Sequence, residues 1–287
     1  MNILNDVIIS VSQGISELFP ISSLGHIVII QSLLNIHVTK SSSFFLPFIV
    51  SLHVGTAIAL IVFFFKEWKA IVIALFSTAI KGKLSNDKTE NFAWKLVIAT
   101  IPVGIIGLLF SSFVKKIFGD PLIAAIFLIV NGFILYVGEM LIKKKKLKGL
   151  ASKGSGSRKK LEDLSFLDTI IIGISQIFAL IPGISRSGAS MVAGLLYNLD
   201  HEDAAYFSFM LATPVILAAG LLEVPSLFST HSLTPFWYAL LGGVISGITA
   251  YFAVKFLMKY FEKGTLKPYA YYSVIIGILS VFIFTRV

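Results

Sequence analysis

The stretch Glu17-Leu18-Phe19-Pro20-Ile21-Ser22-Ser23-Leu24-Gly25-His26 interrupts an otherwise apolar run that covers residues 7–34. Proline removes a backbone donor and clashes with the preceding helical turn, whereas Gly and Ser favour a turn and a new helix start. The stretch therefore predicts two half-length helices joined by a break, rather than one continuous span.

A second apolar run, residues 169–196, is built in the same way, and its break reads Ile181-Pro182-Gly183-Ile184-Ser185-Arg186-Ser187-Gly188. An ungapped alignment that pairs Val7 with Ile170 also pairs several identical polar and small residues: Ser12 with Ser175, Gln13 with Gln176, Ser22 with Ser185 and Gly25 with Gly188. Broken helices at corresponding places in two halves indicate an internal repeat with a binding site near the membrane midplane.

The rest of the chain reads as an all-α integral membrane protein. Residues of the AVILMFWYC set make up 56% of the 287 residues, charged residues only 14%, and the mean hydropathy is +0.89. Six further stretches are long and apolar enough to span a membrane. They cover residues 44–65, 92–114, 121–142, 204–222, 236–258 and 269–284. Residues 70–80 are apolar but too short to cross, which predicts an interfacial or connecting helix.

The charge distribution predicts the topology. If both broken runs are re-entrant hairpins, most of the 24 Lys and Arg residues fall in loops on one face, whereas Lys40, Lys115, Lys116 and Arg286 fall on the other. Basic loops stay on the cytoplasmic side. The first hairpin then enters from outside and the second from inside, as an inverted repeat. One membrane domain, 1–287, would comprise a first half, 1–142, a basic cytoplasmic linker, 143–163, and a second half, 164–287.

Composition also excludes several classes of function. The absence of cysteine excludes disulfides, thiolate metal sites and cysteine nucleophiles. The net charge of +9 is a topology signal rather than a nucleic-acid signal, because the basic residues gather in short loops between apolar spans.

The first break carries acidic, hydroxyl and imidazole groups. Glu17 lies within an apolar helix, with Gln13 one turn earlier on the same face, and an intramembrane carboxylate usually faces a cavity or a partner. A helix N-terminus capped by Ser22 or Ser23 offers free N–H groups to an anion. His26, one turn later, can act as an acid, a base or a nucleophile. The alternative is that Glu17 reaches water at a helix end and that the serines only cap.

The second break places Arg186 at the presumed midplane, where a guanidinium needs an anion. Either Arg186 pairs with Glu17, or it clamps phosphate oxygens with both arms. Its neighbours favour a phosphate cradle: Gly183 allows close backbone approach, and hydroxyls come from Ser185, Ser187 and Ser190. Two other polar residues are expected in secondary roles. His53 either lines the cavity or packs, and Glu139 is expected to pair with Lys143.

These two motifs, Gln13-x-x-x-Glu17 followed by Pro20-Ile21-Ser22-Ser23-Leu24-Gly25-His26, and Pro182-Gly183-Ile184-Ser185-Arg186-Ser187, resemble the undecaprenyl-diphosphate phosphatases of the bacitracin-resistance type. The resemblance covers the whole chain in length, span pattern and motif order. It implies an enzyme of the bacterial cytoplasmic membrane with an outward-facing site. Such an enzyme hydrolyses undecaprenyl diphosphate to the monophosphate, recycles the lipid carrier for cell-wall synthesis and confers bacitracin resistance.

By matching positions, the resemblance implies catalytic roles for Glu17, Ser23, His26 and Arg186. It also implies a divalent cation, Mg²⁺ or Ca²⁺, for which Glu17 and Gln13 are the ligands. Substrate-binding roles are expected for Gln13, Ser22, Gly183, Ser185, Ser187 and Ser190. Two departures are visible. Gln13 stands where the family also uses Glu, and Ser190 stands where Thr is more usual.

The residues leave the nucleophile open among Ser23, His26 and water, with Ser23 preferred and His26 as its general base. They also leave a rival class of function. A transporter or flippase for undecaprenyl phosphate or another anion would use the same inverted-repeat site without releasing phosphate. The preferred metal, the isoprenoid length and the oligomeric state, a homodimer included, are left open too.

Overall fold

The computed structural model describes residues 3–34, 45–85, 87–112, 117, 119–151, 159–228 and 234–286, and within these residues it contains helices and no strands. Six helices are long and apolar enough to cross a membrane, which makes the chain a multi-pass membrane protein. They are α3 (Phe45–Phe63), α5 (Lys88–Leu109), α7 (Pro121–Ala151), α10 (His201–Glu223), α11 (Thr234–Phe261) and α12 (Lys267–Phe284). The six predicted spans are thereby confirmed.

Both predicted breaks are present. The first separates α1 (Ile3–Ser16) from α2 (Ser23–Leu33). The second follows α8 (Phe166–Ser175) and its 3₁₀ continuation η2 (Gln176–Leu180), and it precedes α9 (Arg186–Leu196). The alignment of the two runs pairs Ser23 with Arg186, and these two residues begin α2 and α9. The backbone thus follows the repeat that the sequence indicated.

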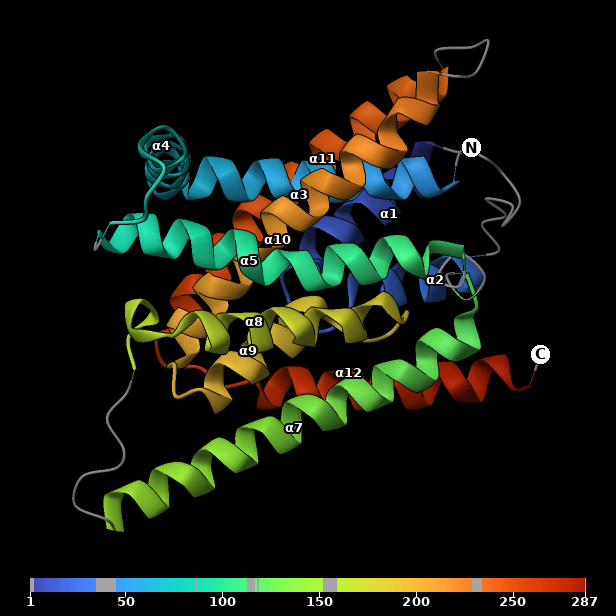
Figure 1. Cartoon of the computed structure of the whole chain (residues 1–287). Helices are drawn as coiled ribbons and strands as arrows, with labels where there is room; N and C mark the ends of the chain where they lie inside the picture. The colour runs from blue at the N-terminus through green and yellow to red at the C-terminus, as the bar shows by residue number, and fades with distance from the viewer. Residues whose placement is uncertain are drawn as a thin grey trace.

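The two helical hairpins reach the middle of the molecule from opposite sides. In Figure 1 the outer ends of α1 and α2 lie at the right, near the N label, whereas α8 starts at the left, the side on which α7 ends. The hairpins also pack in corresponding ways. In the first hairpin α1 contacts α11 of the second half, and in the second hairpin α8 contacts α5 of the first half. Re-entry into a membrane from opposite faces stays a prediction.

The predicted linker, 143–163, begins as helix, because α7 continues through its lysines to Ala151. Lysine is a good helix former, so a run of lysines can extend a span beyond its apolar part. The short helix η1 (Leu161–Asp163) ends the linker. Residues 152–158 lie outside the described residues, as do Lys40, Lys115 and Lys116. The predicted short helix is α4 (Phe65–Lys81), which α3 precedes and which packs on α5.

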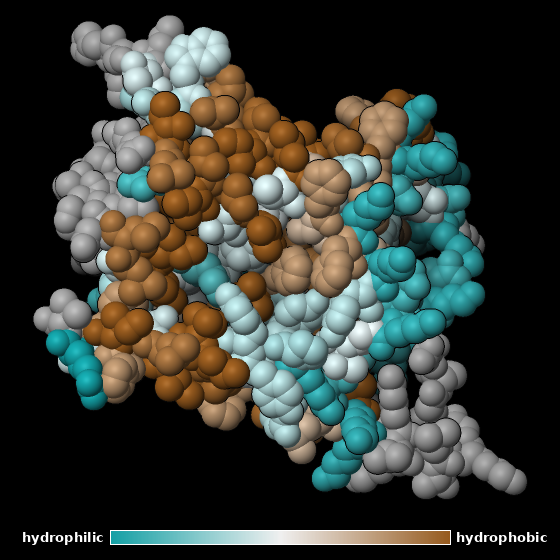
Figure 2. Space-filling model, turned by 180° about the vertical axis from the view of Figure 1, so that it is seen from behind, coloured by the Kyte–Doolittle hydropathy of each residue, from teal (hydrophilic) through white to brown (hydrophobic). Residues whose placement is uncertain are grey.

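Polar and apolar surfaces are separated. Figure 2 shows a broad hydrophobic area over one face and hydrophilic residues along its right-hand edge. That edge is the left of Figure 1, where α4 and the start of α8 lie. Exposed apolar side chains along α11 and α12, such as Phe252, Phe256, Ile275 and Ile278, match a surface that contacts lipid rather than water.

Close helix packing depends on glycine. A Cβ on Gly55 of α3 would collide with the carbonyl oxygen of Gly243 of α11, so these two spans touch backbone to backbone. Small residues allow such an approach in membranes, where apolar contact with lipid competes with apolar contact between helices. The pair α3 and α11 supports the first hairpin, because α1 packs against α11 as well.

We expect Gly55→Ala to lower the free energy of unfolding by about 2 kcal/mol, because overpacking forces the two backbones apart. The matched control is Gly104→Ala in α5, where a Cβ would meet no atom within 4 Å. Thermal unfolding in detergent measures both. Equal midpoints for the two variants would contradict the close packing of α3 on α11.

Candidate active site

The first break ends in a strained residue. Ser22 has φ +68°, a left-handed conformation that is uncommon outside glycine, and it caps α2 by accepting from Gly25 N at 3.3 Å. Such strain persists only where the surrounding structure imposes it, and it gathers at functional sites. The turn points the side chains of Glu17 and Ser23 toward each other.

The helix that follows the second break is capped in the same way. Gly183 takes φ +100°, and Ser185 caps α9 by accepting from Gly188 N at 3.1 Å. The two breaks touch: the Cα of Gly183 lies 3.0 Å from where a Cβ on Gly25 would stand, and Ser187 Oγ donates to the Phe19 carbonyl at 3.1 Å. Two helix N-termini, each with free N–H groups, therefore converge on one place.

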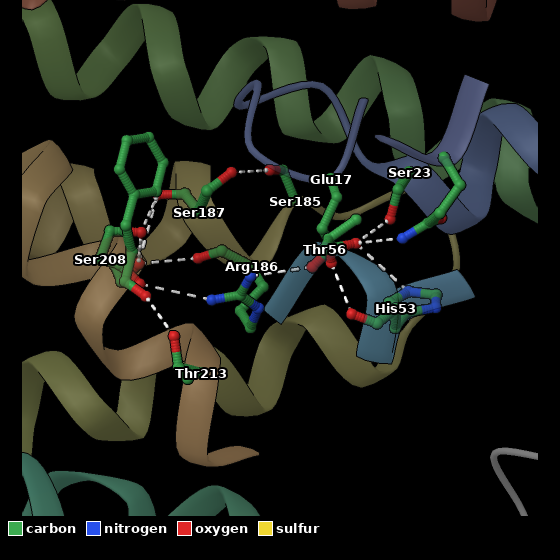
Figure 3. Close-up of polar contacts among 12 residues, drawn as sticks. Glu17, Ser23, His53, Thr56, Ser185, Arg186, Ser187, Ser208 and Thr213 are labelled. Carbon is green, nitrogen blue, oxygen red and sulfur yellow. Dashed lines mark hydrogen bonds and ion pairs between the residues drawn. The ribbon is translucent and has the colours of Figure 1, made fainter. Parts of the chain in front are cut away.

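Glu17 is the centre of the site. Its Oε2 accepts from Ser23 Oγ at 2.5 Å and from Gln13 Nε2 at 2.9 Å, and it lies 3.2 Å from His53 Nε2. Its Oε1 accepts from Arg186 Nη2 at 2.8 Å. Figure 3 shows the carboxylate between Arg186 on one side and Ser23 and His53 on the other. The residue is 7% exposed, so this ring of donors replaces water.

Arg186 extends from the second break to Glu17, and strong hydrogen bonds do not use all of its N–H donors. Its Nη1 contacts the Ser208 carbonyl at 3.4 Å, the long end of hydrogen-bond distances. A guanidinium has five N–H donors in a planar fork. With one strong bond to Glu17, it can still bind an anion that enters the adjoining cavity.

That cavity has a volume of about 450 Å³ and two kinds of wall. One end carries Glu17, Ser22, Ser23, His53, Ser185 and Arg186. The remaining wall is mainly apolar and comes from α3, α5, η2 and α10, with residues such as Ile49, Val103, Leu108, Leu180 and Ile216. A charged head group at the polar end with an apolar chain along the wall is the ligand that this shape suits.

Residues 6–279 match the model of the family described as "Bacitracin resistance protein BacA". The chain belongs to this family. It is 42% identical over 273 residues to Undecaprenyl-diphosphatase 2 of Burkholderia ambifaria, covering 95% of this chain and 93% of that protein. It is also 41% identical over 279 residues to Undecaprenyl-diphosphatase of Acidiphilium cryptum, covering 96% and 95%.

The structure brings together four of the residues predicted from the motifs, because Gln13, Ser23 and Arg186 all bind Glu17. Ser22 and Ser185 line the polar end of the cavity. The hydroxyls of Ser187 and Ser190 form hydrogen bonds to other groups of the protein. Ser187 Oγ donates to the Phe19 carbonyl in the first break. Ser190 Oγ donates to the Arg186 carbonyl at 2.9 Å and lies 2.7 Å from Ser208 Oγ. Gly183 provides close approach between the breaks.

His26 lies apart from this cluster. Its Nδ1 is 2.7 Å from the Ser22 carbonyl oxygen and its Nε2 is 2.9 Å from the hydroxyl of Tyr272 in α12. Among the described residues, no hydrogen bond joins it to Glu17, Ser23 or Arg186. His53 takes the place beside Glu17 instead, and it lines the cavity. The two roles left open for His53 are therefore decided in favour of the cavity.

Asn131 of α7 was not foreseen from the motifs. Its Nδ2 donates to the Pro20 carbonyl at 3.0 Å and lies 3.4 Å from Ser273 Oγ, while its Oδ1 accepts from Ser185 N at 2.9 Å. One buried side chain thus clamps both breaks. The signal was present, because Asn131 is a lone amide in an apolar stretch and such residues hydrogen-bond between helices. Glu139, expected to pair with Lys143, instead bonds His201 Nε2 at 2.9 Å.

A divalent cation fits these residues in one way. Within the described residues, no group of three His, Asp or Glu side chains could hold a metal. However, Gln13 Oε1 is buried and has no partner in that part of the chain, and its amide adjoins the Glu17 carboxylate. Mg²⁺ prefers such oxygens and is commonly held by one or two carboxylates, waters and substrate phosphates. The site therefore suits a cation that arrives with phosphate.

We expect Asn131→Leu to destabilise the protein by about 2–4 kcal/mol, because it leaves a buried N–H of Ser185 and the Pro20 carbonyl unpaired. Ser273→Ala is the matched control, since it removes only the 3.4 Å contact of the same amide. Thermal unfolding would show a large drop for the first variant and a small one for the second. A clamp function is excluded if Asn131→Leu unfolds at the wild-type temperature.

Proposed function

We propose that this protein is an undecaprenyl-diphosphate phosphatase, which hydrolyses undecaprenyl diphosphate to undecaprenyl phosphate and inorganic phosphate. The observation that carries this function is the ion pair of Glu17 and Arg186 at the polar end of a mainly apolar cavity. The relatives named undecaprenyl-diphosphatase are similar over nearly the whole chain, both broken hairpins included. The product is the lipid carrier that cell-wall synthesis reuses, and its recycling confers bacitracin resistance.

The diphosphate would bind at the two helix N-termini. Arg186 and N–H groups of both breaks hold phosphate oxygens, and the isoprenoid tail follows the apolar wall. Phosphoryl transfer needs mainly positioning and charge stabilisation. Glu17 and Gln13 would hold the divalent cation, Mg²⁺ or Ca²⁺, which when bound neutralises charge on the phosphates.

Ser23 is the nucleophile we favour. Its hydroxyl donates to Glu17 at 2.5 Å, so the carboxylate is placed to take the proton as Oγ attacks the terminal phosphorus. The anhydride P–O bond then breaks, undecaprenyl phosphate leaves, and water hydrolyses the phosphoserine. His26 as the base or the nucleophile, and direct attack by water, are the alternatives. For His26, the Nε2 would first have to leave Tyr272.

The location follows from the charge distribution. Basic residues gather on the side of the molecule that holds α4, the last turns of α7 and the start of α8. We place this side in the cytoplasm. The first hairpin then opens outward, and the site of this bacterial inner-membrane enzyme faces outward. Undecaprenyl diphosphate and membrane lipids are the partners, and a homodimer stays open.

We expect Arg186→Ala and Glu17→Gln to lower kcat/KM for phosphate release by about 10² or more, because each removes charge-stabilising contacts in a dry site. Arg186→Lys keeps the charge but loses the fork, so it should stay well below wild type. Glu90→Gln is the control, since Glu90 is another buried carboxylate and pairs with Lys81 at 3.3 Å. The assay is phosphate release by purified protein in detergent.

Near wild-type release by folded Arg186→Ala and Glu17→Gln would sink the site. A transporter that uses the same architecture releases no phosphate at all, so wild-type protein in this assay also decides between the two classes.

Chelation should abolish turnover, and Gln13→Glu should lower the Mg²⁺ concentration for half-maximal rate, because a second carboxylate strengthens an oxygen site for a hard cation. Gln13→Leu should raise that concentration. After cations have been removed with a chelator, the rate of phosphate release is measured against Mg²⁺ concentration for the wild type and both variants. An identical Mg²⁺ dependence in both variants and the wild type would remove Gln13 from the cation site.

A further inference from the structure

Two residues hold the ring of His26. Its Nδ1 is 2.7 Å from the Ser22 carbonyl oxygen and its Nε2 is 2.9 Å from the Tyr272 hydroxyl. The rings of His26 and Tyr272 lie nearly parallel, with centroids 5.5 Å apart and an interplanar angle of 11°. His26 belongs to α2 and Tyr272 to α12, so the contact ties the first hairpin to the last span. His26 itself is buried.

The hydrogen bonds hold in either charge state of the ring. A carbonyl oxygen can only accept, so Nδ1 carries a proton. Nε2 then accepts from the Tyr272 hydroxyl when the ring is neutral and donates to it when the ring is charged. The contact is therefore a permanent attachment rather than a switch.

α2 packs against α1 and α7, but its sequence offers few polar groups that could fix its rotation about its own axis. Its sequence, SLGHIVIIQSL, is apolar nearly all round. In a membrane, apolar side chains meet lipid and protein on similar terms, so small residues and hydrogen bonds orient a helix. Gly25 against Gly183 sets the distance between the breaks, and His26 against Tyr272 supplies a fixed direction.

That direction decides where Ser23 points. Ser23 lies one turn before His26, and its Oγ donates to Glu17 at 2.5 Å. A rotation of α2 by about 20° would move an atom about 5 Å from the helix axis by roughly 2 Å. A hydrogen bond does not survive such a shift, because its heavy-atom distance varies by only a few tenths of an ångström.

We propose that Tyr272 is a positioning residue of the active site, which holds α2 through His26 so that Ser23 stays on Glu17. This inference rests on the proposed function for its effect on turnover, but not for its effect on the orientation of Ser23. Tyr272 does not line the cavity, and among the described residues it has no hydrogen bond to Glu17, Ser23 or Arg186.

The first test is a double-mutant cycle on phosphate release. Tyr272→Phe keeps the aromatic ring and removes the hydroxyl. We expect it to lower kcat by about 10-fold with KM changed less than about twofold, because misplacement of a reacting group slows the chemical step. In a His26→Gln background the same change should cost nothing further, since Tyr272 acts through His26. Tyr271→Phe, one residue earlier on α12, is the control and should match wild type.

The second test does not need catalysis. The chain has no cysteine, so Ser23→Cys provides a single thiol at the site. Its labelling rate by a small methanethiosulfonate reagent reports how the thiol faces the cavity. We expect Tyr272→Phe, combined with Ser23→Cys, to change that rate by about threefold or more, whereas Tyr271→Phe leaves it unchanged.

The proposal is overturned if Tyr272→Phe alters neither kcat nor the labelling rate of the Ser23→Cys thiol. It is equally overturned if the loss of kcat persists undiminished in the His26→Gln background. If wild-type protein releases no phosphate, hydrolysis itself is wrong, and the labelling rates alone then decide whether Tyr272 positions residue 23.

Discussion

A carboxylate on one hairpin and a guanidinium on the other meet at 2.8 Å inside a membrane protein, and neither is stable there alone. Removing two charges from water costs several kcal/mol for each ion, and pairing offsets that cost only when further hydrogen bonds complete the arrangement. Glu17 has those bonds, from Gln13, Ser23 and His53. The two broken helices are therefore bound to each other by the same groups that can act on a phosphate.

The surrounding fold serves this contact. Pro20 and Gly183 break the helices, Asn131 clamps the two breaks, and glycine lets backbones approach closely enough for the side chains to meet. The adjoining cavity is polar at the ion pair and mainly apolar along the rest of its wall. A lipid diphosphate satisfies both parts at once, because its head group brings Arg186 a second anion while its tail replaces lipid contacts along the wall.

Much of this could be read from the sequence, and the parts that could not have a common cause. Proline, glycine and serine act locally, so the two breaks, the six spans and a helix start beside Ser22 and Ser23 were predictable. Glu17 and Arg186 were conspicuous because charge is costly in a membrane. The partners of Asn131, His26 and Glu139 come from distant parts of the chain, namely Ser185, Tyr272 and His201. A single sequence does not reveal such pairings, so Glu139 was matched with its neighbour Lys143. The membrane orientation and the roles of the site residues stay predictions.

The most direct test of the central claim is an experimental structure of the Ser23→Ala variant with undecaprenyl diphosphate bound, since removal of the proposed nucleophile should trap the substrate. We predict that the diphosphate lies between the two breaks, with a phosphate on the Arg186 guanidinium and facing residue 23, and with the tail along α5 and α10. Diphosphate density away from Arg186, for instance in the groove between α3 and α11, would contradict a shared site built from both hairpins.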